Sequence, residues 1–239
     1  IQEAIKNKLA VRTSPDLNEI VLGNTDSLKL LDLGIEDLLE REKVNPDLKL
    51  MQKDIRFQTV LVSGAGGTIG SQLCKEIIKN NPDKVLLLDS NEYALYSILN
   101  ELEDRNKKSS IEIIPLLASI QDSKIINNIL KTWRPDTVYH AAAYKHVPIV
   151  EQNITESLKN NVFGTLVIAK SALVNKVSNF VFISTDKAVR PTNFMGATKR
   201  LGEICLQALF ENKTQEEITK FSIVRFGNVL DSSGSVIPK

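Results

Sequence analysis

The chain has 239 residues, of which 42% are hydrophobic and 25% charged, the balance of an ordinary folded globular protein. Its 30 basic and 29 acidic residues give a net charge of +1, so the basic footprint of a nucleic-acid-binding protein is missing. No apolar run reaches the roughly 20 residues of a membrane span. The two cysteines, Cys74 and Cys205, form no CxxC pair, and this sparse use of cysteine favours a reducing, cytoplasmic location.

Residues 1–52 differ from the rest because they contain no cluster of residues that could carry chemistry. Ile1–Leu9 and Glu36–Glu42 have the pattern of short amphipathic helices. We expect residues 1–52 to be the end of an upstream domain with a linker, and residues 53–239 to form a second domain. The first residue is Ile1 rather than Met, so we expect an internal piece of a longer protein.

From Arg56 onward, short apolar runs alternate with segments of helical period. The runs expected to be strands are Thr59–Ser63, Lys84–Asp89, Ile111–Leu117, Thr137–His140, Asn179–Ser184 and Phe221–Val224. The expected helices are Ser71–Lys79, Glu92–Leu102, Ser123–Leu130, Thr155–Val174 and Thr198–Phe210. Strands that are apolar throughout, with helices between them, predict an α/β fold with a doubly wound parallel sheet covered on both faces.

A glycine-rich loop joins the first of these strands to the first helix. Gly64, Gly67 and Gly70 have the spacing GxxGxxG, a variant of the dinucleotide fingerprint. The first glycine permits a tight turn, the second a close approach of backbone to pyrophosphate, and the third close packing of helix on strand. The N–H groups of the helix N-terminus would face the phosphates, so the loop predicts a Rossmann cofactor site.

Asp89 ends the second strand, at the position where a ribose-binding carboxylate is expected. A carboxylate accepts hydrogen bonds from ribose hydroxyls and repels a 2′-phosphate. Its neighbours Leu88, Ser90 and Asn91 include no cation that could bind such a phosphate. We therefore expect NAD as the cofactor, in preference to NADP.

Beyond the glycine loop, the sequence resembles the extended short-chain dehydrogenase/reductase family. The matching segments are His140–Ala143, Asn161–Thr165, Ser184–Lys187 and Arg225–Val229. Within that family, Ala143–Pro148 and Thr185–Ala188 are similar to the bacterial UDP-N-acetylglucosamine 4,6-dehydratases of polysaccharide and glycan biosynthesis, the CapD-like proteins. Ile35–Leu39 and Asn45–Leu48 resemble the membrane-anchored long form of that subgroup.

The resemblance implies a Rossmann domain with an incomplete C-terminal substrate region, a UDP-sugar substrate, and a parent protein anchored to the inner membrane with this domain in the cytoplasm. Homo-oligomer formation is left open. The cofactor-binding residues it implies are Gly64, Gly67, Thr68, Ile69, Gly70, Asp89, Ser90, Ser119, Ile120, Ala141, Ala142, Ala143 and Lys199. The substrate contacts it implies are Lys145, Asn161 and Asn228. A metal site is not expected, because no carboxylate or cysteine cluster accompanies His140 and His146.

One position departs from the wider family, in which a catalytic Tyr lies four residues before a Lys. Here the Lys is Lys199, and Met195 occupies the position of the Tyr. A thioether cannot exchange a proton, so we expect Met195 to be a packing residue. The long-form dehydratases are similar in having Met there, and Lys199 would hold the nicotinamide ribose, as its equivalents do in the family.

The resemblance also implies three catalytic roles. Thr185 would orient the C4 hydroxyl of the sugar, Asp186 would protonate the departing C6 oxygen, and Lys187 would remove the C5 proton. Lys187 needs a lowered pKa for this, which burial or nearby positive charge could supply. Two alternatives to a 4,6-dehydratase are a UDP-sugar 4-epimerase, which relies on the absent Tyr, and a non-catalytic NAD-binding scaffold.

Overall fold

The computed structural model describes residues 12–13, 31–32, 46–107, 110–214, 216–227 and 229. The chain divides into two units, residues 1–46 and residues 47–239. In the first, β1 (Arg12–Thr13) pairs antiparallel with β2 (Leu31–Asp32). The segments Ile1–Leu9 and Glu36–Glu42, expected to be helical, lie outside the described residues.

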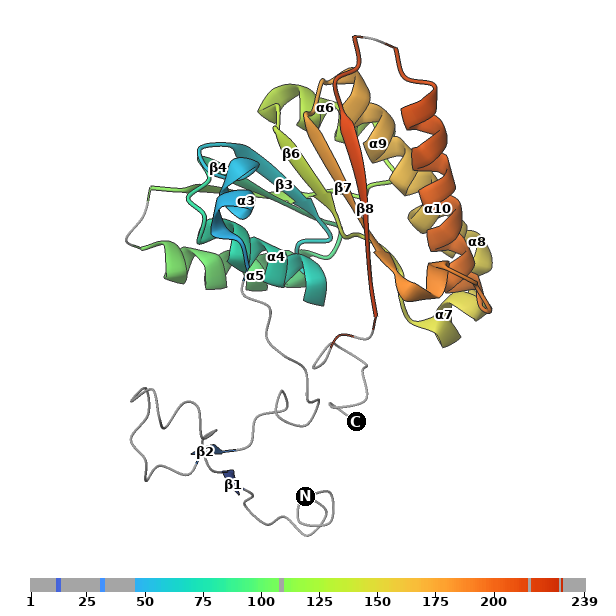
Figure 1. The fold of residues 1–239 in the computed structure, drawn as a ribbon, viewed down its shortest axis with the longest axis horizontal. Coiled ribbons are helices and arrows are strands. Elements are labelled where there is room, and N and C mark those ends of the chain that lie inside the picture. Colours follow the sequence, from blue (N-terminus) through green and yellow to red (C-terminus); the bar gives the residue numbers. More distant parts are fainter. Residues whose placement is uncertain are drawn as a thin grey trace. The chain divides into compact units, whose positions relative to one another are not determined.

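The second unit is built on one six-stranded sheet (Figure 1). Its strands are β3 (Thr59–Ser63), β4 (Lys84–Asp89), β5 (Glu112–Leu117), β6 (Thr137–His140), β7 (Asn179–Thr185) and β8 (Lys220–Phe226). Every neighbouring pair is parallel, in the order β5-β4-β3-β6-β7-β8. This is the strand order of a Rossmann fold, with its switch point between β3 and β6, and the predicted α/β class is confirmed.

The long helices of this unit cover the sheet on both faces. They are α4 (Thr68–Ile78), α5 (Glu92–Asn106), α6 (Ser123–Trp133), α9 (Thr165–Val174) and α10 (Phe194–Glu211). The short ones are α3 (Leu48–Lys53), α7 (Val147–Gln152), α8 (Ile154–Leu158), the π-helix η2 (Lys159–Gly164) and the 3₁₀ turn η3 (Asp186–Ala188). Of the short elements, α3, α7 and η3 were not expected, because one or two turns are too short to show a helical period.

Alternate residues of the strands pack into two separate hydrophobic cores, one on each face of the sheet. Val60 and Val62 of β3 pack with α4 and α5, whereas Leu61 packs with α6, α9 and α10. These strand residues are completely buried. A central parallel sheet must bury both faces, which explains why its strands are apolar at every position rather than at every second one. Truncating such a residue to Ala costs about 2–5 kcal/mol of folding free energy.

A single helix was expected over Thr155–Val174, but the structure divides it into α8, η2 and α9. Within the π-helical turn, Asn161 is buried and its amide binds the backbone of Tyr144. Gly164 lies against Ile120, so closely that a Cβ there would be 2.7 Å from Ile120 Cδ1. The wider turn therefore occurs where the helix meets the loops that follow β5 and β6.

Candidate functional site

The glycine-rich loop forms a tight turn between β3 and α4. Gly64 has φ +69°, and a Cβ on it would lie 2.7 Å from the backbone N and Cα of Ala142. A Cβ on Gly70 would lie 1.9 Å from the carbonyl oxygen of Gly64. Only glycine fits both positions, so the loop is pressed against the start of the helix and against the end of β6. Gly67 is the N-cap of α4 and provides no side-chain cap.

Asp89 fixes this loop from the neighbouring strand. Its Oδ2 accepts a hydrogen bond from Gly66 N at 2.9 Å, and its Oδ1 accepts one from Asn91 N at 2.9 Å. Each carboxylate oxygen can accept a second hydrogen bond, so both contacts leave capacity for ribose hydroxyls. Ser90, next in the chain, is exposed. The geometry therefore brings the predicted ribose carboxylate against the predicted phosphate loop.

Five further residues expected at the cofactor, Ser119, Ile120 and Ala141–Ala143, follow β5 and β6 at the same edge of the sheet. Thr68 and Ile69 begin α4, and Lys199 lies in α10. Ala141 N donates to the carbonyl oxygen of Ser63 at 3.0 Å, and Ala141–Ala143 are half-buried beside the glycine loop. Ser119 is half-buried, whereas Ile120 is 5% exposed and belongs to the core beneath α6 and α9. The topology thus gathers the strand ends at the switch point, where ligands bind in open α/β sheets.

His140, the last residue of β6, is completely buried beneath this edge. Thr165 Oγ1 donates its only proton to Asn161 O at 2.7 Å, so His140 Nε2 must donate to Thr165 Oγ1 at 2.9 Å. His140 Nδ1 then accepts from Ser63 Oγ at 2.6 Å. Burial, with a contribution from Lys199, lowers the pKa of His140 to about 3. A neutral imidazole therefore ties β3, β6 and α9 together.

Asn161, an expected substrate contact, has all its hydrogen-bonding groups engaged inside the protein. Its Oδ1 accepts from Tyr144 N at 2.8 Å and from Asn160 Nδ2 at 3.2 Å. Its Nδ2 donates to Tyr144 O at 3.0 Å and to Thr198 Oγ1 at 3.1 Å. The residue is completely buried. Its amide therefore holds the loop after β6 against α10.

Lys199 lies in the first half of α10 and is 7% exposed. Its Nζ donates to Ile183 O at 2.8 Å and lies 4.4 Å from the centre of the Phe182 ring. Burial lowers the pKa of Lys199 to about 7, against the opposing charge of Glu203. Met195, one turn earlier, is 6% exposed, as expected for a packing residue.

Thr185, Asp186 and Lys187 form the end of β7 and the turn η3. Thr185 Oγ1 donates to Asp186 Oδ1 at 2.9 Å, and Lys187 Nζ donates to the same oxygen at 3.2 Å. The Asp186 side chain is 55% exposed and that of Lys187 37%, so both are open to a ligand. The hydrogen bonds from Thr185 and then Lys187 lower the pKa of Asp186.

The sequence reasoning missed a buried carboxylate beside this segment. Glu203 on α10 accepts from Ser184 Oγ at 2.6 Å, and from Arg225 Nε at 2.7 Å and Nη2 at 2.6 Å. Arg200 Nη1 adds a bond of 3.0 Å. Burial acts to raise the pKa of Glu203, but these hydrogen bonds and charges lower it to about 2. The available signal was the i, i+4 spacing from Lys199, which puts Glu203 on the same buried face.

Of the remaining predicted substrate contacts, Lys145 is exposed in the loop after β6. Asn228 lies outside the described residues. Tyr144, beside Lys145, is 50% exposed, and its backbone is held by Asn161.

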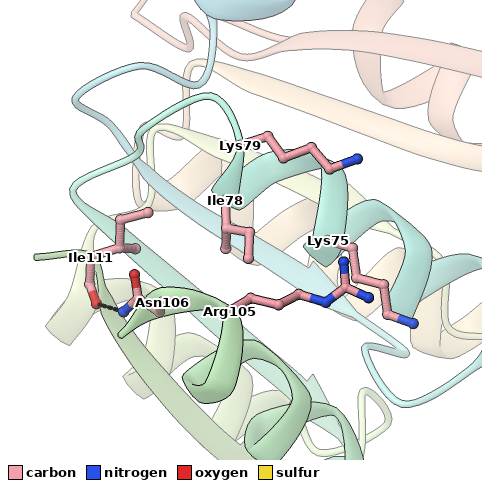
Figure 2. Close-up of a pocket in the computed structure, with 6 residues that line it drawn as sticks. All are labelled: Lys75, Ile78, Lys79, Arg105, Asn106 and Ile111. Atoms are coloured by element: carbon pink, nitrogen blue, oxygen red, sulfur yellow. Dashed lines mark hydrogen bonds between the residues drawn. The ribbon is translucent and has the colours of Figure 1, made fainter. Parts of the chain in front are cut away.

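A surface hollow between α4 and α5 lies away from this site (Figure 2). Its lining consists of Lys75, Ile78, Lys79, Arg105, Asn106 and Ile111. Glu101 pairs with Lys75 and with Arg105, both at 2.8 Å. These cations sit near the C-terminal ends of their helices, where positive charge is favoured, and we assign them a structural role.

Among the described residues, no group of three His, Cys, Asp or Glu side chains is arranged to hold a metal ion. The described helices include none that is long and apolar enough to cross a membrane.

The chain is similar to proteins of polysaccharide biosynthesis. A family model described as "Polysaccharide biosynthesis protein" matches residues 60–239. The capsular polysaccharide biosynthesis protein CapD of Staphylococcus aureus is 44% identical over 224 residues, which are 94% of this chain and 37% of that protein. A UDP-N-acetylglucosamine 4,6-dehydratase (inverting) of Campylobacter jejuni is 31% identical over 182 residues, and a UDP-glucose 4-epimerase of Rickettsia bellii is 32% identical. The alignments with these two cover 76% of this chain and 52% of each relative.

Solved structures share the fold. Pen from Bacillus thuringiensis has a TM-score of 0.72 and 34% identity, covering 77% of this chain and 56% of that one. The dTDP-glucose 4,6-dehydratase DesIV of Streptomyces venezuelae, solved with NAD bound, has a TM-score of 0.60 and 21% identity, covering 70% of this chain and 55% of that one. At that identity the likeness concerns the fold alone. The chain spans about two-fifths to one-half of the curated relatives named here.

Proposed function

The chain belongs to the polysaccharide biosynthesis protein family, and from that premise we propose that it is the cofactor-binding part of a nucleotide-sugar 4,6-dehydratase. Its substrate is a UDP-N-acetylglucosamine-type sugar. The observation that carries the proposal is the open cluster Thr185–Asp186–Lys187 at the carboxyl end of β7, beside the buried Lys199. That edge of the sheet is where a Rossmann fold binds its ligands.

The residues of the phosphate loop fit a dinucleotide. Gly64 and Gly70 leave no room for a Cβ, as the tight turn and the close helix–strand packing of a dinucleotide-binding loop require. Asp89 offers acceptors to the ribose, and its negative charge favours NAD over NADP. When bound, NAD supplies the hydride acceptor for oxidation at C4 of the sugar. Lys199, whose buried Nζ donates to Ile183 O, would hold the nicotinamide ribose.

The chemistry of a 4,6-dehydratase assigns a task to each exposed polar group of the cluster. Oxidation at C4 makes the C5 proton acidic, Lys187 removes that proton, and Asp186 protonates the oxygen that leaves C6 as water. Bound NAD would also supply the hydride that C6 needs to give a 4-keto-6-deoxy sugar. Thr185 lies next to both groups and would orient the C4 hydroxyl.

A UDP-sugar 4-epimerase is the second candidate, because three of the relatives are named UDP-glucose 4-epimerase. Met195 argues against it, since epimerases of this family rely on the Tyr that Met195 replaces. A scaffold without activity is a third reading, against which the intact Thr185–Asp186–Lys187 cluster and the buried Lys199 argue.

Incubation of the full-length protein, rather than of this part alone, with NAD and UDP-N-acetylglucosamine tests these candidates. Mass spectrometry of a dehydratase reaction would show a product lighter by one water, with a ketone that reduces with borodeuteride. An epimer of unchanged mass would favour the epimerase, and unchanged substrate would favour the scaffold. By the likeness of Ile35–Leu39 to the long-form dehydratases, we also propose that the whole protein is anchored to the inner membrane with this domain in the cytoplasm.

A further inference from the structure

The carboxylate of Glu203 has all its acceptor sites occupied inside the protein. Its Oε1 accepts from Ser184 Oγ at 2.6 Å and from Arg225 Nε at 2.7 Å. Its Oε2 accepts from Arg225 Nη2 at 2.6 Å and from Arg200 Nη1 at 3.0 Å. A carboxylate offers about four such sites, and this side chain is 2% exposed. No site is left for a cofactor or a sugar, so Glu203 can influence a reaction only through its partners.

Two of these partners belong to β7 and β8, the strands against which α10 packs (Figure 1). Ser184 in β7 and Arg225 in β8 are directly opposite each other in the sheet. Ser184 is followed at once by the Thr185–Asp186–Lys187 cluster. Arg225 lies two residues before Gly227, at which an added Cβ would be 3.7 Å from Asp186 Oδ2. Glu203 therefore joins both strands just before they reach the cluster.

The same helix contacts the chain on either side of Thr185 and Asp186. Lys199, one turn before Glu203, donates from Nζ to Ile183 O at 2.8 Å. Nearer the start of α10, Gly196 lies so close to η3 that an added Cβ would be 2.5 Å from the carbonyl oxygen of Lys187. The position of the cluster is therefore determined by its packing on α10.

We propose that Glu203 is a positioning residue for the reaction: by binding Ser184 and Arg225 together, it places the Thr185–Asp186–Lys187 cluster relative to β8 and to Lys199. This inference rests on the proposed function and adds a residue that touches neither cofactor nor sugar. The rate of a reaction between bound groups depends steeply on their alignment, and a misplacement of about 1 Å can cost about a hundredfold. Loosening the ends of β7 and β8 should therefore slow the chemistry.

Arg200 offers a comparison within the same network. It donates to the same carboxylate as Arg225, but it lies on α10 itself, three residues before Glu203. The two arginine side chains are similarly exposed, 44% for Arg200 and 37% for Arg225. Removing either one takes a cation away from Glu203. Of the two, Arg225 is the one that connects a strand to the helix.

The matched substitutions Arg225→Gln and Arg200→Gln in the full-length protein test the proposal. With NAD and UDP-N-acetylglucosamine, Arg225→Gln should lower kcat by about a hundredfold, while the Kd of NAD and the KM of the sugar change only a few-fold. Arg200→Gln should keep kcat within a few-fold of wild type. Arg225→Lys keeps the charge but loses the two-point geometry, so it should behave like Arg225→Gln.

Equal losses of kcat in Arg200→Gln and Arg225→Gln would overturn the proposal, because the charge around Glu203 would then matter rather than its connection to β8. Full activity in Arg225→Lys would overturn it for the same reason. Unchanged kcat in all three variants would leave Glu203 a purely structural role.

Amide hydrogen exchange provides a second readout that needs neither cofactor nor sugar. In Arg225→Gln, protection should be lost at the paired ends of β7 and β8, Ser184–Thr185 and Arg225–Phe226, and kept in the central strand β3. Arg200→Gln should match wild type throughout, and retained protection at the strand ends of Arg225→Gln would contradict the positioning role. A wild-type protein that leaves the sugar unchanged contradicts the proposed function instead, and the exchange measurement then decides the positioning role by itself.

Discussion

Glu203 of α10 and Arg225 of β8 form a two-point ion pair, with Arg225 Nε 2.7 Å from Oε1 and Nη2 2.6 Å from Oε2. Arg225 is the sheet partner of Ser184, whose hydroxyl binds the same carboxylate. The pair therefore fastens the ends of β7 and β8 to the helix that carries Lys199. The Glu203 side chain is 2% exposed, so its charge is compensated by these partners rather than by water.

We expect Glu203 to make folding stability depend on acid pH. Its pKa of about 2 in the folded protein lies below the ordinary value of 4.5, so its contribution is complete above pH 4.5 and is lost as the pH falls towards 2. Urea unfolding at several pH values should show a steeper loss in wild type than in Glu203→Gln. The exposed Glu103, changed to Gln, is the control. Parallel pH curves for wild type and Glu203→Gln would contradict this assignment.

We expect His140 to remain neutral at pH 5 and to oppose folding as the pH falls. Its pKa of about 3 lies below the ordinary value of 6.5, so the unfolded chain binds a proton between these values and the folded one does not. Stability is therefore lost from pH 6.5 downwards, and His140→Gln should flatten that slope. Nitrogen NMR should find the proton on Nε2. His146→Gln, at an exposed position, serves as the comparison, and a protonated His140 at pH 5 would refute the assignment.

Gly64→Ala should weaken both folding and NAD binding. The φ of +69° costs an L-residue roughly 1–2 kcal/mol, and the added Cβ would lie 2.7 Å from Ala142 backbone atoms. Gly67→Ala is the matched change, since its Cβ would lie 3.3 Å from Gly64 O at an ordinary φ of −73°. Denaturant unfolding of both variants and NAD titration of Gly64→Ala provide the test. Equal effects of the two substitutions on unfolding would mean that the turn conformation is not decisive.

We expect NAD to bind more tightly than NADP, and Asp89→Ala to weaken NAD more than NADP. The carboxylate accepts ribose hydrogen bonds and repels a 2′-phosphate, and it also holds Gly66 N at 2.9 Å. Calorimetric titration of both cofactors into both proteins measures the difference. Tighter binding of NADP by wild type would overturn the assignment of NAD.

Steady-state turnover should depend on the cluster and not on any tyrosine. Lys187→Ala and Asp186→Asn should each lower kcat by about a hundred- to ten-thousand-fold while NAD affinity stays nearly unchanged. Met195→Leu conserves volume at a position that is 6% exposed and should cost less than about 1.5 kcal/mol. Tyr144→Phe is the control. Loss of turnover in Tyr144→Phe, with an active Lys187→Ala, would make Tyr144 the base.

The sequence by itself determined the fold class. Uniformly apolar strands such as Thr59–Ser63 and Lys84–Asp89, separated by helical segments, can be buried only in a parallel sheet covered on both faces. The glycine spacing and Asp89 also predicted a cofactor site at one edge of the sheet, because the strand ends of such a sheet meet at one side. These signals are local in the chain, and the family motifs are local as well. The membership of the family that they indicated is confirmed by the match over residues 60–239.

Only the tertiary structure decided which polar side chains around that edge are buried in hydrogen bonds within the protein and which are exposed. Asn161 was expected to meet the substrate, yet its amide binds Tyr144, Asn160 and Thr198 inside the protein. Lys199 is the buried lysine with the lowered pKa, whereas Lys187 is exposed and paired with Asp186. Glu203 is held as a buried carboxylate by its ion pair with Arg225, which is 22 residues away in the chain. Burial and hydrogen-bond partners depend on which distant segments pack together, and no spacing within one segment contains that information.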